Sequence, residues 1–257
     1  MSINVEKLSI TQLDKITAFN NADELEFIMD ELQETTLAQE EEITDITGRG
    51  GRKIGALKKN KSVTGTGTNG VVVGGALAAM LGGKVENGTY KVRWTDENLV
   101  VKSNKVTVNK EPVGTAGSEI VAVHVKNKDG SLGKALTQDA TVSEGKFTYD
   151  SKTITFNDGQ FTDGTELVAF YDIEAEGAKI ANKSNEYSKT LKLYIDCEAQ
   201  DTCDNVYHGQ FIIYRADFHG TFDIAMGSDP TTQAFEFSAL AGGCAGNNYL
   251  WEFIVFE

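Results

Sequence analysis

The 257-residue chain carries 38 Asp and Glu residues against 24 Lys and Arg, a formal net charge of −14, and 40% of its residues are hydrophobic. This composition supports a packed core and argues against wholesale disorder, and the length suits one large or two modest domains. Lys and Arg supply most of the affinity of proteins for nucleic-acid phosphates. An acidic chain of this kind is therefore not expected to bind nucleic acid as its main function.

The chain shows no sign of secretion or of a membrane anchor. Residues 1–20 lack the basic opening and apolar middle of a secretory signal. The longest apolar run, Val71 to Leu81, is too short for a membrane-spanning helix, which takes about 20 residues. Three cysteines, Cys197, Cys203 and Cys244, form an odd and sparse set typical of a reducing cytoplasm. A Cys197–Cys203 disulfide remains geometrically possible in an oxidising setting.

Residues 1–47 are acidic, and their apolar residues fall near helical spacing. Asp23 is a good N-cap residue, so we expect a helix over Glu24–Glu34. The stretch Gly48 to Lys61 then carries six basic residues and no acid, so the rest of the chain has a net charge of −14 − 6 = −20. Residues 62–83 are rich in Gly, Thr and Ala, which favours close backbone packing in strands or at a subunit contact.

The rest of the sequence has the short alternating runs of β-strands. Residues 107–175 combine short strand patterns with Asp-Gly and Asn-Asp-Gly turn signals, which suggests a small immunoglobulin-like (Ig-like) sandwich. Residues 174–188 are polar and are expected to form a linker. Predicted strands in these two regions and beyond are Glu119–Val125, Lys146–Tyr149, Thr153–Phe156, Glu166–Tyr171, Leu191–Ile195, Gln210–Arg215, Thr221–Met226, Gln233–Ser238 and Leu250–Phe256.

We therefore predict a mainly β protein: an antiparallel β-sandwich or barrel body with a flanking helix and an inserted Ig-like β-sandwich. Residues 1–106 and 177–257 are assigned to the body, and residues 107–176 to the insert. The body would hold the N-terminal helical segment, an assembly loop at 48–83 and the C-terminal strands. The alternation of strands and helices that a doubly wound sheet requires is absent.

Motifs for cofactors and metals are weak. Gly65, Gly67 and Gly70 fit G-x-G-x-x-G, but the polar residues KKNKSV precede them where a dinucleotide site has an apolar strand, and the next acid, Glu86, follows Gly82-Gly83. Lys61-Ser62 resembles the end of a phosphate-binding loop, yet Asn60 replaces its glycine. A zinc set of Cys197, Cys203, His208 and His219 has looser spacing than zinc sites use. We expect no cofactor and no metal.

Catalytic signatures are also missing. The sequence contains neither G-x-S-x-G nor H-E-x-x-H, and its carboxylates are scattered, as on a solvated face. We therefore expect no enzyme activity. The segregation of charge is more informative, since acidic residues immediately precede the basic stretch. Such patches serve either as a solvated loop or as a contact that sets the register between subunits. The candidate contact residues are Glu40, Glu41, Glu42, Asp45, Arg49, Arg52, Lys53, Lys58, Lys59 and Lys61.

Three stretches of the sequence resemble the tail tube proteins of tailed bacteriophages and phage-tail-like particles. The first is residues 45–75, where a basic stretch runs into SVTGTGTNG. The second is the C-terminal part, with YRAD at 214–217, TFDI at 221–224 and DPTTQAFEF at 229–237. The third is the middle region, whose KNKDGSLG (126–133) and KTITFNDG (152–159) resemble Ig-like modules of phage structural proteins.

The resemblance implies a structural virion protein that forms hexameric rings, which stack into a hollow tail tube through which phage DNA is ejected. Strands of the subunits would combine into an inner barrel with the insert projecting outward, and an acidic wall would keep DNA from adhering in passage. The implied partners are other copies, tail sheath, tail terminator and baseplate proteins, with assembly in the host cytoplasm and a final place in the virion tail. The alternatives are another virion component, such as a capsid or decoration protein, or an Ig-like surface-binding module.

Overall fold

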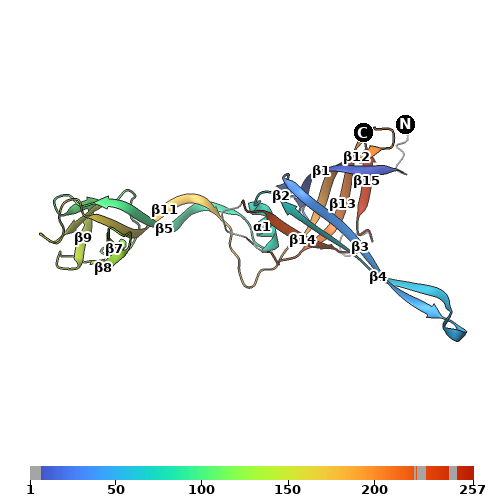
Figure 1. Cartoon of the computed structure of the whole chain (residues 1–257), viewed down its shortest axis with the longest axis horizontal. Helices are drawn as coiled ribbons and strands as arrows, with labels where there is room; N and C mark the ends of the chain where they lie inside the picture. Colours follow the sequence, from blue (N-terminus) through green and yellow to red (C-terminus); the bar gives the residue numbers. More distant parts are fainter. Residues whose placement is uncertain (1–6, 223, 225–229, 243–247) are drawn as a thin grey trace. The chain divides into compact units, whose positions relative to one another are not determined.

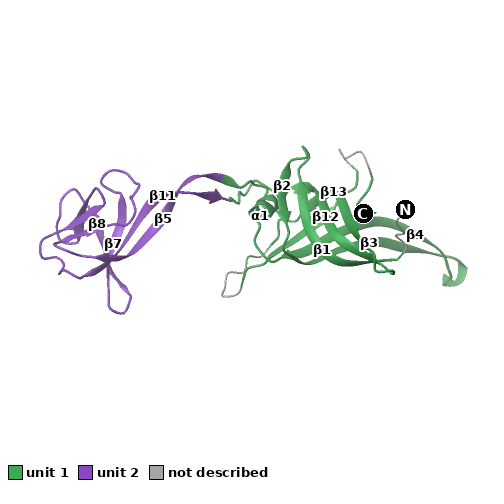
Figure 2. Cartoon of the chain, turned by 90° about the horizontal axis from the view of Figure 1, so that it is seen from above, with its two compact units in different colours: residues 1–86, 180–257 green, residues 87–179 purple. Residues whose placement is uncertain are grey.

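The computed structural model describes residues 7–222, 224, 230–242 and 248–257. It divides into two compact units, residues 1–86 with 180–257 (the body) and residues 87–179 (the insert), which Figure 2 colours separately. Both are built from sheets in which almost all strand pairs of the described residues are antiparallel, with one short α-helix in that part of the chain. The mainly β prediction is therefore confirmed.

The body is an eight-stranded sheet with the order β2-β1-β12-β13-β14-β4-β3, and β15 pairs with β13 (Figure 1). The elements of this unit are β1 (Leu8–Phe19), β2 (Leu25–Met29), β3 (Leu32–Thr47), η1 (Arg49–Gly51), β4 (Lys53–Asn69), α1 (Gly74–Met80), β12 (Thr190–Asp201), β13 (Val206–Phe218), β14 (Gln233–Ala239) and β15 (Glu252–Phe256). Although β2 and β3 stand at opposite ends of this order, only Asp30 and Glu31 join them. The sheet must therefore curl until its ends approach each other.

The body core lies on the face of the curled sheet where alternate apolar side chains point inward. Ile16 and Ala18 of β1, for example, face the interior with Leu193 of β12, the period-two pattern of a strand with one buried face. Helix α1 packs Ala76 and Ala79 against the same cluster. The glycines of β4 have a packing role there, because a Cβ at Gly65 would lie 2.1 Å from the ring of Phe237.

The predicted helix at Glu24–Glu34 is wrong, because this segment holds β2 and the start of β3. Phe27 and Met29 are buried two positions apart while Ile28 between them is exposed, which is strand periodicity. Pairing of β2 with β1 overrides the local helical spacing. The flanking helix is instead α1, within residues 62–83, where small residues had suggested strands or a subunit contact.

The insert has its own sheet, in the order β5-β11-β7-β8-β9-β10-β6, and its own core. Its strands are β5 (Glu86–Val100), β6 (Lys105–Thr107), β7 (Ile120–Lys126), β8 (Leu132–Gln138), β9 (Lys146–Asp150), β10 (Thr153–Phe156) and β11 (Glu166–Lys179). The pairing of β8 with β9 is parallel. The Ig-like assignment remains a prediction, and the compact unit spans residues 87–179 where the sequence suggested 107–176.

Most strands expected in this half of the chain are present, with changes at their ends. The predicted linker at 174–188 is wrong for its first part, because β11 continues to Lys179 as the partner of β5. Its residues are polar because this ribbon is exposed to solvent. The predicted strand Thr221–Met226 falls largely outside the described residues, and Thr221 and Phe222 belong to no strand.

Candidate assembly surfaces

The longest projection of the body is the outer part of the β3–β4 hairpin, residues 40–62, which we call the arm. β3 and β4 pair along their whole lengths, but β14 covers only Thr64–Asn69 of β4. Beyond that point the arm continues as a two-stranded ribbon (Figure 1). No residue of the arm is buried. Two-stranded ribbons are marginally stable by themselves in water, so the arm is suited to contact with another molecule.

The acidic and basic residues predicted for a contact face each other across this hairpin. Lys58 lies 2.8 Å from Glu41, Lys59 lies 3.1 Å from Glu42, and Lys53 lies 2.5 Å from Asp45. The hydrogen bond to Glu41 raises the pKa of Lys58 above its ordinary value. Solvent-exposed pairs of this kind contribute little to stability. They join the two strands of the arm and leave part of its charge without a partner.

The uncompensated charge lies mainly near the tip. Within the described residues, Arg49, Arg52, Lys61 and Glu40 have no ion-pair partner within 4.0 Å. Gly50 and Gly51 have φ values of +78° and +77°, which lets the chain turn tightly between the two arginines. The tip therefore presents two guanidinium groups to solvent.

Both faces of the arm also expose large apolar side chains. Ile43 and Ile54 are 53% and 61% exposed, and Ile46 and Leu57 are 49% and 55% exposed. In the ladder, Ile46 pairs with Gly55 and Thr44 pairs with Leu57, whereas Ile43 pairs with Lys58 on the other face. An exposed ribbon with apolar side chains on both faces is typical of protein-interaction surfaces.

Two further surfaces are the open edges of the sheet. β12 covers one side of β1 over Leu8–Phe19, but β2 covers the other side only from Ile16 onward. β15 pairs with β13 on one side and, in the described part of the chain, with nothing on the other. Ile10 on β1 and Ile254 on β15 are 52% and 46% exposed. A four-stranded segment, β1-β12-β13-β15, thus ends in an open edge on each side.

β15 itself is firmly attached to the sheet. Phe253 stacks on Phe211 with ring centroids 4.3 Å apart, and Tyr214 donates a hydrogen bond to Glu252. That hydrogen bond is the main reason why the pKa of Tyr214 rises to about 12. The open edge of β15 is therefore held in a fixed place, ready to accept a neighbouring strand.

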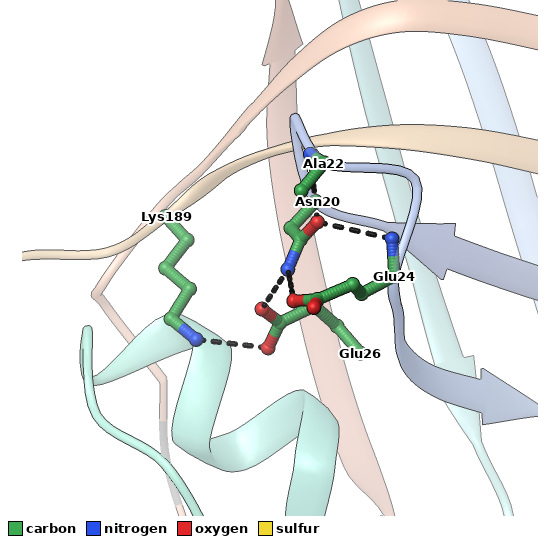
Figure 3. A network of polar contacts seen from close by, with 5 residues as sticks. All are labelled: Asn20, Ala22, Glu24, Glu26 and Lys189. Atoms are coloured by element: carbon green, nitrogen blue, oxygen red, sulfur yellow. Dashed lines mark hydrogen bonds and ion pairs between the residues drawn. The ribbon is translucent and has the colours of Figure 1, made fainter.

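A polar network fixes the other end of β1 (Figure 3). The side-chain carbonyl of Asn20 accepts hydrogen bonds from the backbone N–H groups of Ala22 and Glu24, and its side-chain amide NH₂ donates to the carboxylates of Glu24 and Glu26. Lys189 lies 2.8 Å from Glu26. Burial opposes ionisation of Glu26, but the ion pair with Lys189 and the Asn20 hydrogen bond outweigh it and lower the pKa. The network ties the β1–β2 turn to the segment before β12.

The residues considered for zinc do not form a site. No group of three potential ligands exists in the described part of the chain. Cys197 is buried and free, and its pKa is raised to about 11, mainly by burial; Cys203 is exposed and also free, and Cys244 lies outside the described residues. His208 packs on Phe256. His219 lies 3.2 Å from Glu236 and 2.9 Å from Ser238.

The first two glycines of the motif, Gly65 and Gly67, lie in β4, and Gly70 directly follows that strand. Gly67 lies under the ring of Phe235, as Gly65 lies under Phe237, so both glycines serve packing of the sheet. Lys61 and Ser62, which resembled a phosphate loop, are also strand residues of the arm. The charge pattern of the sequence marks the arm but not the two open edges, because the sequence of a single strand does not show which strands pair with it.

The fold defines a class: a β protein whose sheet has open edges and a long exposed arm, a form suited to assembly with other copies. The family model described as the YomU/Tube protein family matches residues 9–249, and the chain belongs to this family. A comparison with curated proteins finds no match. Among the described residues, no helix is long and apolar enough to cross a membrane.

Proposed function

We propose that the protein is the structural subunit of a bacteriophage tail tube, which assembles into rings that stack around a channel for DNA. The family match supports a tube protein. Assembly into rings is supported by the two open edges of the segment β1-β12-β13-β15. Because these edges lie on opposite sides of one subunit, pairing β15 of one copy with β1 of the next gives a head-to-tail contact, the kind that closes into rings.

The arm supplies the second contact in this proposal. Its exposed apolar residues and its tip arginines would be covered by a neighbouring subunit, which explains why an isolated ribbon keeps such side chains in solvent. Six copies in a ring are implied by the resemblance to tail tube proteins. An acidic channel wall would repel DNA and let it pass, in keeping with the net charge of −14.

The remaining partners follow from the same proposal. Tube ends would meet tail terminator and baseplate proteins, a sheath would surround the tube in contractile tails, and the protein would reside in the virion tail. It would have no catalytic role. A capsid or decoration protein would form shells or bind to them, and a surface-binding module would stay monomeric, so electron microscopy of the purified protein separates these alternatives.

Cross-linking tests the ring contact directly. Ile10→Cys and Ile254→Cys would stand on opposite edges of one subunit, three strand spacings or about 14 Å apart, too far for an intramolecular disulfide. Under oxidation, the double variant should give a ladder of covalent oligomers that ends at the ring size. Ile10→Cys combined with Val121→Cys, an exposed position of the insert, is the control and should give no ladder. A double variant that stays monomeric would contradict the ring.

A further inference from the structure

The insert is joined to the body by a two-stranded ribbon, residues 86–89 of β5 and 176–179 of β11, which we call the neck. All eight of these residues are exposed, and none belongs to the core cluster of either unit. The first buried residue of β5 is Asp96, which accepts hydrogen bonds from Asn109 and Tyr171 inside the insert. Two-stranded ribbons are marginally stable in water, so the neck depends mainly on its ladder hydrogen bonds.

A pair of glycines interrupts the neck. Arg93 of β5 contacts Asp172 of β11 across the ladder. Because the strands are antiparallel, five steps along each one, 93 − 5 = 88 and 172 + 5 = 177, bring Gly88 opposite Gly177. A shallow hollow lined by these two glycines and their immediate chain neighbours lies at the same place. Side-chain pairs across a ladder stabilise a sheet, and this position has none.

Neither glycine is required by the backbone or by packing. Neither has a φ in the left-handed region, a Cβ at Gly177 would meet nothing within 4 Å, and a Cβ at Gly88 would lie 3.6 Å from the Tyr90 hydroxyl. Gly65 of β4 differs, because a Cβ there would collide with Phe237. A side chain would fit at both neck positions. What the two glycines change is stiffness, since glycine leaves the backbone its greatest freedom and weakens a strand.

One side-chain contact spans the glycine pair. Tyr90 lies two residues after Gly88 on the same face of β5, and Lys179 lies two residues after Gly177 on the same face of β11. The Lys179 Nζ lies 5.1 Å from the centroid of the Tyr90 ring. A cation–π contact at an exposed site is weak. The contact can therefore close the neck across the glycines and can also break and form again.

We propose that Gly88 and Gly177 form a hinge, closed by the Tyr90–Lys179 contact, that lets the insert change its direction relative to the body. The hinge ends where β5 enters the insert core at Asp96. This inference goes beyond the proposed tube and does not depend on it. If the body is fixed in an assembly, the hinge gives each insert freedom to turn toward whatever it meets.

Spin labels on the two units test the hinge. Val206→Cys and Val121→Cys provide exposed label positions in the body and in the insert, in a Cys203→Ser/Cys244→Ser background. Pulsed electron spin resonance of unassembled subunits should give a broader distance distribution for this pair than for a reference pair within the insert, Val121→Cys and Leu132→Cys. Equally narrow distributions would overturn the hinge.

Variants of the neck make the test specific. Gly88→Val/Gly177→Val adds a β-branched pair across the ladder, which should narrow the distribution and raise the hydrogen-exchange protection of the neck amides by about two- to fivefold. Tyr90→Ala removes the closing contact and should broaden the distribution. Gly177→Val alone repeats the stiffening test if the double variant does not fold, because its side chain enters open space.

The matched control is Gly133→Val, which makes the same change in β8 of the insert, outside the neck. It should leave the distribution between the two units unchanged. An unaltered width in the stiffened neck or in Tyr90→Ala contradicts the proposal, and so does a narrowing by Gly133→Val. Tube formation is not a readout here, so failure of the hinge leaves the proposed tube untouched.

Discussion

The arm and the insert are both excursions of antiparallel strands from the body, yet they differ in what stabilises them. The insert encloses its own cluster, in which Phe147 and Ile154 are fully buried. The arm has no buried residue at all and exposes Ile54 and Leu57 to solvent. Since burial of apolar surface is the main favourable term in folding, we expect the insert to fold by itself and the arm to gain its stability against a partner.

Deleting the arm or the insert should give the largest difference in tube formation. Replacing residues 41–60 by an Asn-Gly turn should leave the body folded, because no core residue lies in that segment, but should abolish tubes. Replacing residues 87–179 by a short Gly-Ser link should preserve tubes, because β5 and β11 are neighbours and their outer ends therefore lie close together. Thermal unfolding and electron microscopy measure the two properties. Tubes from the arm deletion would show that the arm is dispensable.

A single core substitution in the insert or in the body should separate the stabilities of the two units, with a smaller effect than a deletion. Phe147→Ala should destabilise the insert by about 3–5 kcal/mol, the usual cost of removing a buried phenylalanine, without reducing tube yield. Denaturant unfolding should then show an early transition of the insert and an unchanged transition of the body. Phe237→Ala, the matched change in the body core, should instead lower both the body transition and the tube yield. Equal effects of the two variants would mean that the units are not energetically separate.

The same contrast explains what the sequence could predict. Strands of the insert were predictable because each alternates between a closed core and solvent, as in Lys146–Asp150. The β2 segment was not, since its burial depends on pairing with β1, and local spacing around Phe27 suggested a helix. For the arm, charge segregation marked residues that the structure places in one exposed hairpin, and their role as contacts stays a prediction. The pairing of Lys58 with Glu41 inside one hairpin depends on the register of β3 with β4, which the sequence of a single strand does not specify.

The smallest expected effect concerns the Glu26–Lys189 pair, which anchors the body independently of both excursions. The folded-state pKa of Glu26 lies below its ordinary value of 4.5. The pair therefore stabilises the body fully above about pH 4.5, and this contribution disappears as the pH falls through the folded-state pKa. Glu26→Gln should lower the free energy of unfolding by about 1 kcal/mol at pH 7, and the difference from the unaltered protein should shrink below pH 4.5.

Glu97→Gln, an exposed change in the insert, should show no such pH dependence. Urea unfolding of the body at pH 7 and at pH 3.5 measures both, and a difference that stays constant with pH would mean that Glu26 acts through packing and not through its charge.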